Sequence, residues 1–231
     1  PGAGALLYGV TGSGKTFVYL EAVRRALAAG RGAIVLVPEI ALTPQTVRRL
    51  RGAFGDEVAV LHSGLSDGER ADAWRLIRRG QRRVVVGARS AIFAPVPSLG
   101  LLVRDEEHEA SYKNGEAPRY HARDVAFVRA RLEGARVVLG SATPSLEAMA
   151  RVGRELSLLR LPARIGARPL PPVELVDVRT APLVAALAPV PWSEVLDAAV
   201  EVGLARGDQA LLLLNRRGFA AYLQCRQCAS V

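Results

Sequence analysis

The sequence has only two cysteines among its 231 residues, and it has no apolar run near the length of a membrane-spanning helix. Cys225 and Cys228 form a single C-x-x-C close to the C-terminus, which excludes a disulfide framework. A helix that crosses a bilayer needs about 18 consecutive apolar residues. The first residues also lack the basic-then-apolar layout of a secretory signal. These absences predict a cytoplasmic protein.

Lysine is scarce as well, because Lys15 and Lys113 are the only two among 31 basic residues and arginine supplies the rest. Against 22 acidic residues the formal net charge is +9. Excess positive charge favours a polyanionic partner, since a protein that neutralises phosphates releases condensed counterions. Charge alone therefore favours a nucleic acid, although a genome rich in arginine codons would give the same composition.

Seven short apolar runs alternate with helical stretches over residues 1–162, as in an α/β sheet. Helices are expected between them, for example at Lys15–Ala29 and Arg70–Arg79. The runs are apolar throughout, which is typical of strands covered on both faces. They are Ala5–Tyr8, Ala33–Val37, Val58–Leu61, Val84–Val86, Leu99–Val103, Val137–Leu139 and Leu156–Leu161. The pattern predicts one doubly wound, largely parallel α/β domain.

Prolines crowd residues 163–191, which we interpret as a connector because proline removes ladder donors and resists helix interiors. Within this connector, Val173–Val178 could form a strand. Beyond it, the sequence predicts a helix from Ser193 to Ala205, ended by Gly207, and a strand at Ala210–Leu214. So few elements cannot bury their own apolar faces. Residues 192–231 are therefore expected to be the incomplete start of a second domain.

A phosphate-binding loop is predicted where the sequence matches G-x-x-x-x-G-K-[ST] between a strand and a helix. Its glycines let backbone N–H groups face phosphate oxygens, and the helix that begins near Gly14 adds partial positive charge. Lys15 would reach the β and γ phosphates of ATP, and Thr16 would ligate magnesium. The alternative is a glycine-rich turn without a ligand. The nucleotide-binding residues are Gly9, Val10, Thr11, Gly12, Ser13, Gly14, Lys15 and Thr16.

An acidic box, Asp105-Glu106-Glu107-His108, follows the apolar run Leu99–Val103. It would lie at the carboxyl end of a central strand, where α/β sheets bind ligands. Asp105 would hold magnesium, and Glu106 would orient and polarise the attacking water. An exposed acidic turn is the alternative. Arg104 is unexpected at a buried position, because a buried arginine needs a partner. It either pairs with a nearby carboxylate or lies at an exposed strand end.

The string Gly140-Ser141-Ala142-Thr143-Pro144 follows another apolar run. By itself it indicates only a helix entry, with Thr143 as N-cap and Pro144 in the first helical position. In third place after a phosphate loop and an acidic box, it is typical of a helicase. A small hydroxylated loop between two lobes can contact both nucleotide and nucleic acid.

The phosphate loop, the acidic box and Ser-Ala-Thr, in this order, resemble the motor of superfamily-two helicases. Further strings resemble one branch of them, the bacterial replication-restart helicases (primosomal protein N′). These strings are Leu36–Gln45, His62–Ser66, Val86–Pro95, Asp105–Tyr112, Pro118–Asp124, Gly140–Glu147 and Leu214–Gly218. The resemblance spans nearly the whole chain. It implies a RecA-like P-loop NTPase lobe with a parallel sheet, followed by the incomplete start of a second RecA-like lobe.

The resemblance also implies a function: an ATP-dependent DNA helicase that moves 3′ to 5′ in replication restart and primosome assembly. The chain would be a fragment that binds ATP without efficient turnover by itself. ATP and magnesium are the implied cofactors. Stalled forks and single-stranded DNA are the implied substrates. The implied partners are single-stranded-DNA-binding protein and other primosome proteins, and no association with a membrane is expected. The alternatives are a DNA-binding scaffold with an inactive motor and a stand-alone P-loop NTPase.

Residues for DNA binding or coupling are implied by the same resemblance. Thr43, Arg89 and Ser90 would contact the strand backbone, and Ser141 and Thr143 would couple nucleotide to DNA. An aromatic-rich loop would sense single strands, since aromatic faces stack bases and cations follow phosphates; a solvated connector is the alternative. This loop contributes Tyr112, Lys113, Arg119, Tyr120 and His121. For Arg48, Arg49, Arg51 and the arginines of residues 75–83, solvated helix faces are favoured.

Cys225 and Cys228 fit the first pair of cysteines in the zinc-binding insertion of that family. Tetrahedral zinc needs four ligands, and a single C-x-x-C supplies two. The three histidines, His62, His108 and His121, lie far upstream. We therefore expect half of a structural zinc site, completed only in a longer protein. A redox dithiol and incidental thiols are the alternatives.

Overall fold

A computed structural model describes residues 4–38, 44–167, 169, 171–184 and 192–213. The chain divides into two compact units, Pro1–Pro169 and Leu170–Val231. Thr43, Cys225 and Cys228, which the sequence assigns to DNA and zinc, lie outside the described residues. The same holds for residues 214–218.

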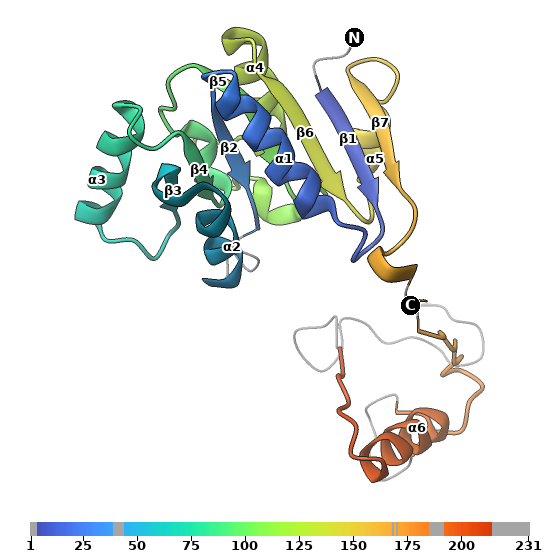
Figure 1. Cartoon of the computed structure of the whole chain (residues 1–231). Helices are drawn as coiled ribbons and strands as arrows, with labels where there is room; N and C mark the ends of the chain where they lie inside the picture. The colour runs from blue at the N-terminus through green and yellow to red at the C-terminus, as the bar shows by residue number, and fades with distance from the viewer. Residues whose placement is uncertain (1–3, 39–43, 168, 170, 185–191, 214–231) are drawn as a thin grey trace. The chain divides into compact units, whose positions relative to one another are not determined.

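A seven-stranded parallel sheet forms the centre of the first unit (Figure 1), with the strand order β3-β4-β2-β5-β6-β1-β7. The strands are β1 (Gly4–Gly9), β2 (Gly32–Leu36), β3 (Val58–Leu61), β4 (Val84–Gly87), β5 (Leu99–Arg104), β6 (Arg136–Ser141) and β7 (Leu156–Leu161). Every predicted apolar run is confirmed as a strand, and the doubly wound α/β fold class is confirmed with it.

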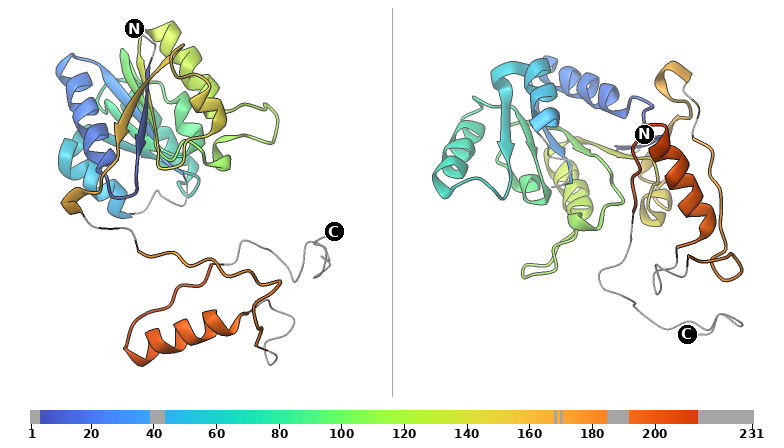
Figure 2. Two further views of the ribbon diagram at one scale, coloured as in Figure 1. Left: turned by 90° about the vertical axis from the view of Figure 1, so that its right-hand side faces the viewer. Right: turned by 90° about the horizontal axis from the view of Figure 1, so that it is seen from below.

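Helices cover both faces of this sheet, which Figure 2 shows nearly edge-on in its left panel. The helices of the unit are α1 (Lys15–Ala28), α2 (Pro44–Phe54), α3 (Asp67–Arg78), α4 (Ala122–Glu133) and the short α5 (Leu146–Met149). Successive strand residues face opposite sides of a sheet. Accordingly, Leu6 and Ile34 pack into a core with α3, α4 and α5, whereas Leu7 and Val35 pack into a second core with α1 and α2. No helix among the described residues is long and apolar enough to cross a membrane.

Local sequence signals explain where these helices begin and end. In a capping box before α3, Ser66 Oγ accepts from Glu69 N at 3.3 Å and Glu69 Oε2 accepts from Ser66 N at 2.9 Å. This box starts α3 at Asp67, three residues before the predicted start at Arg70. Gly134 ends α4 at a φ of 63°, a left-handed conformation that glycine adopts without a Cβ penalty. The predicted helices are therefore confirmed, with their ends shifted by a few residues.

The sheet topology gathers the loops that carry the sequence motifs. All strands are parallel, so their carboxyl ends lie at one edge of the sheet, where such folds bind ligands. Strands β5, β6 and β1 are neighbours in that order and end at Arg104, Ser141 and Gly9. The acidic box, the Ser-Ala-Thr loop and the phosphate loop therefore follow three adjacent strands.

Short 3-10 helices complete the unit: η2 (Gly55–Glu57), η3 (Arg89–Phe93), η4 (Ala110–Tyr112) and η5 (Ile165–Ala167).

The second unit has one described helix, α6 (Glu194–Ala205). Its N-cap is Ser193, whose Oγ accepts from Leu196 N at 3.2 Å, so the predicted helix is confirmed. Val173–Val178, a possible strand by sequence, does not form one, and the strand predicted at Ala210–Leu214 is absent over its described residues, 210–213. A strand needs a neighbouring backbone for its hydrogen bonds, and these segments pair with none among the described residues.

Candidate functional site

The phosphate loop forms one wall of a cavity of about 360 Å³ at the carboxyl end of β1. Residues 11–16 line it, and Asp105 and Glu106 enter it from the end of β5. Gly12 and Gly14 have φ values of 80° and 91°, which side chains other than glycine rarely adopt. Lys15 Nζ donates to the Gly9 carbonyl at 3.0 Å and so lies within the loop. The structure brings the predicted nucleotide residues together with both predicted catalytic carboxylates.

Glu106 has the conformation and electrostatics of a strained, partly buried acid. Its φ is 43°, an uncommon value for a residue other than glycine, and such strain clusters at functional sites. Burial, followed by repulsion from Asp105, raises the pKa of the Glu106 carboxyl above its usual range. Glu106 Oε2 also lies 3.8 Å from His108 Nδ1. The raised pKa makes the Glu106 carboxylate a better proton acceptor than an ordinary glutamate.

The donor set of the cavity fits a magnesium ion that is bound together with phosphates. Magnesium typically takes one or two carboxylates and completes its shell with waters and substrate phosphates. Thr16 and Asp105 line the same cavity and supply a hydroxyl and a carboxylate. Among the described residues, no group of three or more His, Cys, Asp or Glu side chains could hold a metal ion. The hydroxyl of Thr16 and the carboxylate of Asp105 are the donors that suit magnesium bound together with a nucleotide.

Tyr19 of α1 orients Asp105, a role that sequence reasoning missed. The Tyr19 hydroxyl donates to Asp105 Oδ1 at 2.8 Å, and the ring is buried. Burial and the nearby Asp105 raise the pKa of Tyr19, so its hydroxyl keeps its proton. Gly140 leaves the room for this contact, because a Cβ at that position would overlap the Tyr19 hydroxyl. One hydrogen bond thus joins the start of α1 to the acidic box.

Replacing Tyr19 with phenylalanine is expected to raise the magnesium concentration needed for nucleotide binding about tenfold. Loss of a hydrogen bond that orients a metal ligand commonly lowers metal affinity by about 10- to 100-fold. Magnesium titrations of ATP binding, followed by calorimetry, would measure the shift. Tyr8→Phe, which alters an exposed hydroxyl on β1, is the matched control. An unchanged magnesium dependence in Tyr19→Phe would show that Tyr19 only fills space.

The acidic box is hydrogen bonded to the Ser-Ala-Thr loop. Glu107 N donates to the Gly140 carbonyl at 2.9 Å. His108 Nδ1 lies 2.8 Å from Ser141 Oγ and 3.4 Å from Thr143 Oγ1, at hydrogen-bonding distance from both hydroxyls. Ser141 and Thr143, which the sequence assigns to coupling, therefore lie against His108, two residues after the predicted catalytic carboxylate Glu106.

The helix after this loop begins two residues later than predicted. Thr143 is not the N-cap, because its N–H donates to Ser141 Oγ at 2.9 Å and stays within the loop. Ser145 caps α5 instead, and its Oγ accepts from Ala148 N at 3.2 Å. Ser145 in turn donates to the buried carboxylate of Glu107, from N at 2.6 Å and from Oγ at 3.1 Å. The competing side-chain contacts of Glu107 thus move the helix start.

Arg104 is buried and pairs with Glu107, which decides between the two alternatives left by the sequence. The Arg104 Nη1 atom lies 3.8 Å from Glu107 Oε2, and Nη2 donates to the Glu107 carbonyl. The guanidinium of Arg104 lies 4.2 Å from the centre of the Tyr112 ring. Burial lowers the pKa of Arg104 to about 10, so the side chain stays charged at neutral pH. The Tyr112 hydroxyl donates to the Asp105 carbonyl at 2.7 Å. Arg104 and Tyr112 therefore hold the backbone of the acidic box.

The aromatic-rich loop is anchored on this buried cluster. Tyr112 is fully buried, so its position fits coupling and not contact with a base. Tyr120 packs edge-on against Phe93 with 5.0 Å between ring centres. His121 caps α4, with Nδ1 accepting from Arg123 N at 3.2 Å. Lys113 and Arg119 are exposed.

Arg89 connects the end of β4 to this loop. Arg89 Nη1 donates to the carbonyls of Ser111 at 3.1 Å and Lys113 at 2.8 Å. Ser90 beside it is exposed. Arg89 and Ser90, at the end of β4, therefore lie beside the start of the aromatic-rich loop. Arg48, Arg49 and Arg51 are exposed on α2, as expected of a solvated helix face, but Arg49 also lines the nucleotide cavity.

Solved structures with the same fold include helicases. The structure of RecG bound to a three-way DNA junction has a TM-score of 0.50 and 26% sequence identity, covering 70% of this chain and 21% of that one. The Pyrococcus furiosus Hef helicase domain has a TM-score of 0.51 and 20% identity, covering 68% of this chain and 35% of that one. Together they support the RecA-like arrangement of the sheet and helices.

Curated relatives are bacterial replication restart proteins named PriA. The Bacillus subtilis protein is 52% identical over 227 residues, 98% of this chain and 28% of the relative. The Synechocystis protein is 48% identical over 232 residues, which cover 98% of this chain and 28% of the relative. The Treponema pallidum protein is 46% identical over 223 residues, which cover 96% of this chain and 33% of the relative. The chain thus spans about a third or less of their length. Residues 1–152 match the family described as DEAD/DEAH box helicase. The chain belongs to the DEAD/DEAH box helicase family.

Proposed function

We propose that the chain is the first motor lobe, and the start of the second, of an ATP-dependent DNA helicase of replication restart that moves 3′ to 5′. The observation that carries this proposal is the junction of three motifs. The cavity of the phosphate loop contains Asp105 and Glu106, and the next two residues of the acidic box are hydrogen bonded to the Ser-Ala-Thr loop. A motor needs such a connection, because the state of the nucleotide must reach the DNA-binding surface.

Each residue of the cavity has a defined task in this proposal. Lys15 and the backbone N–H groups of the phosphate loop hold the phosphates of ATP. Thr16 and Asp105 hold magnesium, which when bound neutralises charge that develops on the phosphates. Glu106 orients a water molecule and accepts its proton. Tyr19 keeps Asp105 in position.

The coupling path runs from Asp105 to the aromatic-rich loop. Tyr112 contacts the Asp105 carbonyl and the Arg104 guanidinium, and Arg89 holds the carbonyls at either side of Tyr112. A single strand bound at Lys113 and Arg119 would displace this loop and, through Tyr112, the backbone next to Glu106. Hydrolysis would in this way respond to DNA.

The similarity to PriA proteins supports a proposal for partners and compartment. Stalled forks, single-stranded-DNA-binding protein and other primosome proteins in the bacterial cytoplasm belong to the proposal. So does a structural zinc ion, with Cys225 and Cys228 as two of its four ligands. Intact Lys15, Thr16 and Asp105 argue against the alternative of a DNA-binding scaffold with an inactive motor.

The test is strand displacement by the longest natural protein that contains these residues. Partial duplexes with a 3′ or a 5′ single-stranded tail are compared, with Lys15→Ala as the control for contaminating enzymes. Because movement is 3′ to 5′, we expect ATP-dependent displacement from the duplex with the 3′ tail and not from the one with the 5′ tail. Hydrolysis should be stimulated by DNA. Hydrolysis without displacement would support the scaffold, and hydrolysis indifferent to DNA would support a stand-alone P-loop NTPase.

A further inference from the structure

A hollow of about 340 Å³ outside the nucleotide cavity lies where β3 and β4 end. Besides Leu61, six polar or aromatic residues line it, and we call them the arginine–tryptophan groove: His62, Ser63, Arg70, Trp74, Arg89 and Ser90. None of the described residues that line it is a carboxylate. The combination of cations, hydroxyls and an indole is the set that single-stranded nucleic acid requires.

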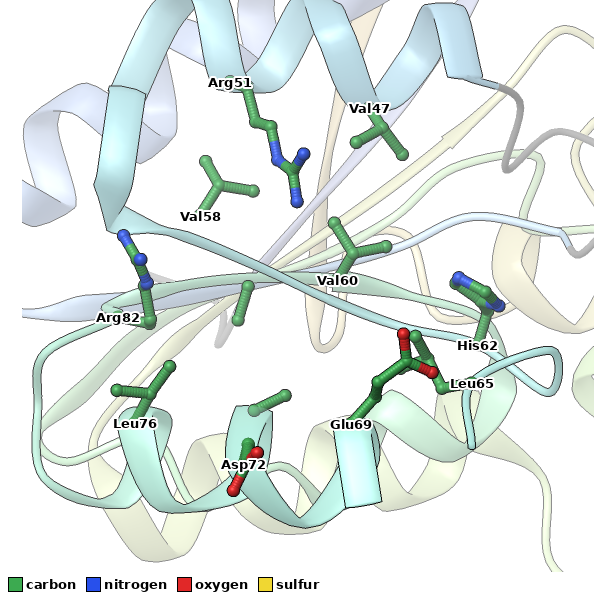
Figure 3. A pocket seen from close by; sticks show the side chains of 12 residues that line it. Val47, Arg51, Val58, Val60, His62, Leu65, Glu69, Asp72, Leu76 and Arg82 are labelled. Atoms are coloured by element: carbon green, nitrogen blue, oxygen red, sulfur yellow. The ribbon is translucent and has the colours of Figure 1, made fainter. Parts of the chain in front are cut away.

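A larger cavity of about 690 Å³, shown in Figure 3, lies on the other flank of α3 and shares His62 with the groove. Glu69 and Asp72 of α3 are among the side chains that line the larger cavity. In this cavity the carboxylates offset the charges of Arg51 and Arg82, whereas the described lining of the groove has cations and no carboxylate, so the groove is the more suitable of the two for DNA. Arg70 and Trp74 are four residues apart and therefore share one side of α3. The helix thus presents Arg70 and Trp74 to the groove, and Glu69 and Asp72 to the other flank.

The groove side chains keep the binding capacity that a strand would use. Trp74 is 38% exposed, which leaves part of the indole accessible to a base. Arg70 Nη2 donates a hydrogen bond to the Leu65 carbonyl at 3.3 Å. Arg89 Nη1 donates to the carbonyls of Ser111 and Lys113. An arginine has five N–H donors, so each of these guanidinium groups has further donors for phosphate oxygens. The hydroxyls of Ser63 and Ser90 add neutral donors beside them.

A smaller hollow continues the groove toward the aromatic-rich loop. It has a volume of about 140 Å³, is lined in part by Pro38 and Ser111, and shares Arg89 and Ser90 with the groove. The two hollows together form a track from Ser111, two residues before the exposed Lys113, to Trp74. A strand that contacts the loop would enter this track without leaving the surface.

We propose that the arginine–tryptophan groove binds single-stranded DNA, with one base stacked on Trp74 and the flanking phosphates against Arg70 and Arg89. The inference deepens the proposed function and depends on it, because it names the base-contacting residue of the same DNA surface. Stacking on an indole is indifferent to base identity, which suits a protein that must move along any sequence.

Intrinsic fluorescence tests the stacking directly, because the sequence has only two tryptophans, Trp74 and Trp192. In a Trp192→Phe variant, oligothymidylate of about 12 nucleotides should quench the remaining emission saturably. An abasic oligomer of the same length should still bind, as seen by anisotropy of a labelled strand, but leave the emission unchanged. Quenching of equal size by the abasic oligomer would overturn base stacking.

Variants separate the base contact from the phosphate contacts. Trp74→Ala should lower oligothymidylate affinity about tenfold with an unchanged salt slope, and Trp74→Phe should retain most of the affinity. Arg70→Gln should reduce the salt slope by about one phosphate. Arg78→Gln, an exposed arginine of α3 outside the groove, is the matched control and should change neither.

Two results would refute the inference in distinguishable ways. Normal affinity in Trp74→Ala, with circular dichroism showing a folded protein, would overturn the groove and leave the proposed helicase intact. Failure of the unmodified chain to bind any oligonucleotide while it binds ATP would overturn the proposed DNA surface as a whole, including the groove.

Discussion

Replacing Lys15 with alanine is expected to abolish measurable ATP binding. The Lys15 ammonium lies within the phosphate loop, 3.0 Å from the Gly9 carbonyl, where it can turn toward the β and γ phosphates. Truncating one partner of a desolvated charge pair costs about 2–5 kcal/mol, which corresponds to about 30- to 4,000-fold in affinity. Arg49 also lines the cavity, but from α2 and outside the loop. Calorimetric titration with magnesium–ATP would measure the loss.

Lys113→Ala is the control that the composition offers, because Lys113 is the other lysine of the sequence. It removes the same charge from the same protein, at an exposed position on the aromatic-rich loop. ATP affinity should be unchanged in this variant, while affinity for single-stranded DNA should fall and depend less on salt. If Lys15→Ala bound ATP as tightly as Lys113→Ala does, the phosphate loop would not be the nucleotide site.

The architecture was predictable from the sequence wherever local pattern and burial agree. Strands that are apolar throughout are recognisable because both faces of a doubly wound sheet are covered. The strand order was not predicted, since β1 lies between β6 and β7, which follow it by more than 120 residues. At residues 173–178 and 210–213, where the apolar pattern indicated strands, pattern and burial disagree and no strand forms. Apolar residues there, such as Leu175 and Leu211, are almost fully exposed.

The candidate site was predictable as motifs and not as contacts. Lys15, Asp105 and Glu106 belong to recognisable strings, so their proximity needed only the fold. Tyr19 meets Asp105 across 86 residues, and nothing in the spacing of the sequence indicates that hydrogen bond. A hint existed in Gly140, whose lack of a side chain becomes meaningful once Tyr19 is seen against it. Trp74 was overlooked because an isolated tryptophan in an amphipathic helix usually packs into the core.

Glu106→Gln is expected to leave ATP binding nearly intact and to lower turnover by about 10²–10⁴-fold, the usual contribution of a general base. The amide is close to the carboxylate in size and still lines the cavity, but it cannot accept the proton of the attacking water. The phosphate loop and Asp105 are untouched, so the nucleotide should bind. Single-turnover hydrolysis in the longest natural protein, compared with calorimetric affinity, separates the two effects. Equal loss of binding in Glu106→Gln and Lys15→Ala would contradict the assignment.

The pH dependence of turnover identifies the role of Glu106 more specifically. The carboxylate form is the active one, and burial together with Asp105 raises the pKa of Glu106 above that of an ordinary glutamate. The kcat/KM for magnesium–ATP, which reports the pKa values of the free enzyme, should therefore fall, as the pH is lowered, at a higher pH than an unperturbed glutamate would give. In Glu106→Gln the residual rate should lose this acid limb, because the titrating group is gone. Glu109→Gln, which removes the nearby carboxylate that contributes least to this shift, should lower the midpoint only slightly and keep the limb. An acid limb that persists unchanged in Glu106→Gln would assign the proton acceptor to a different residue.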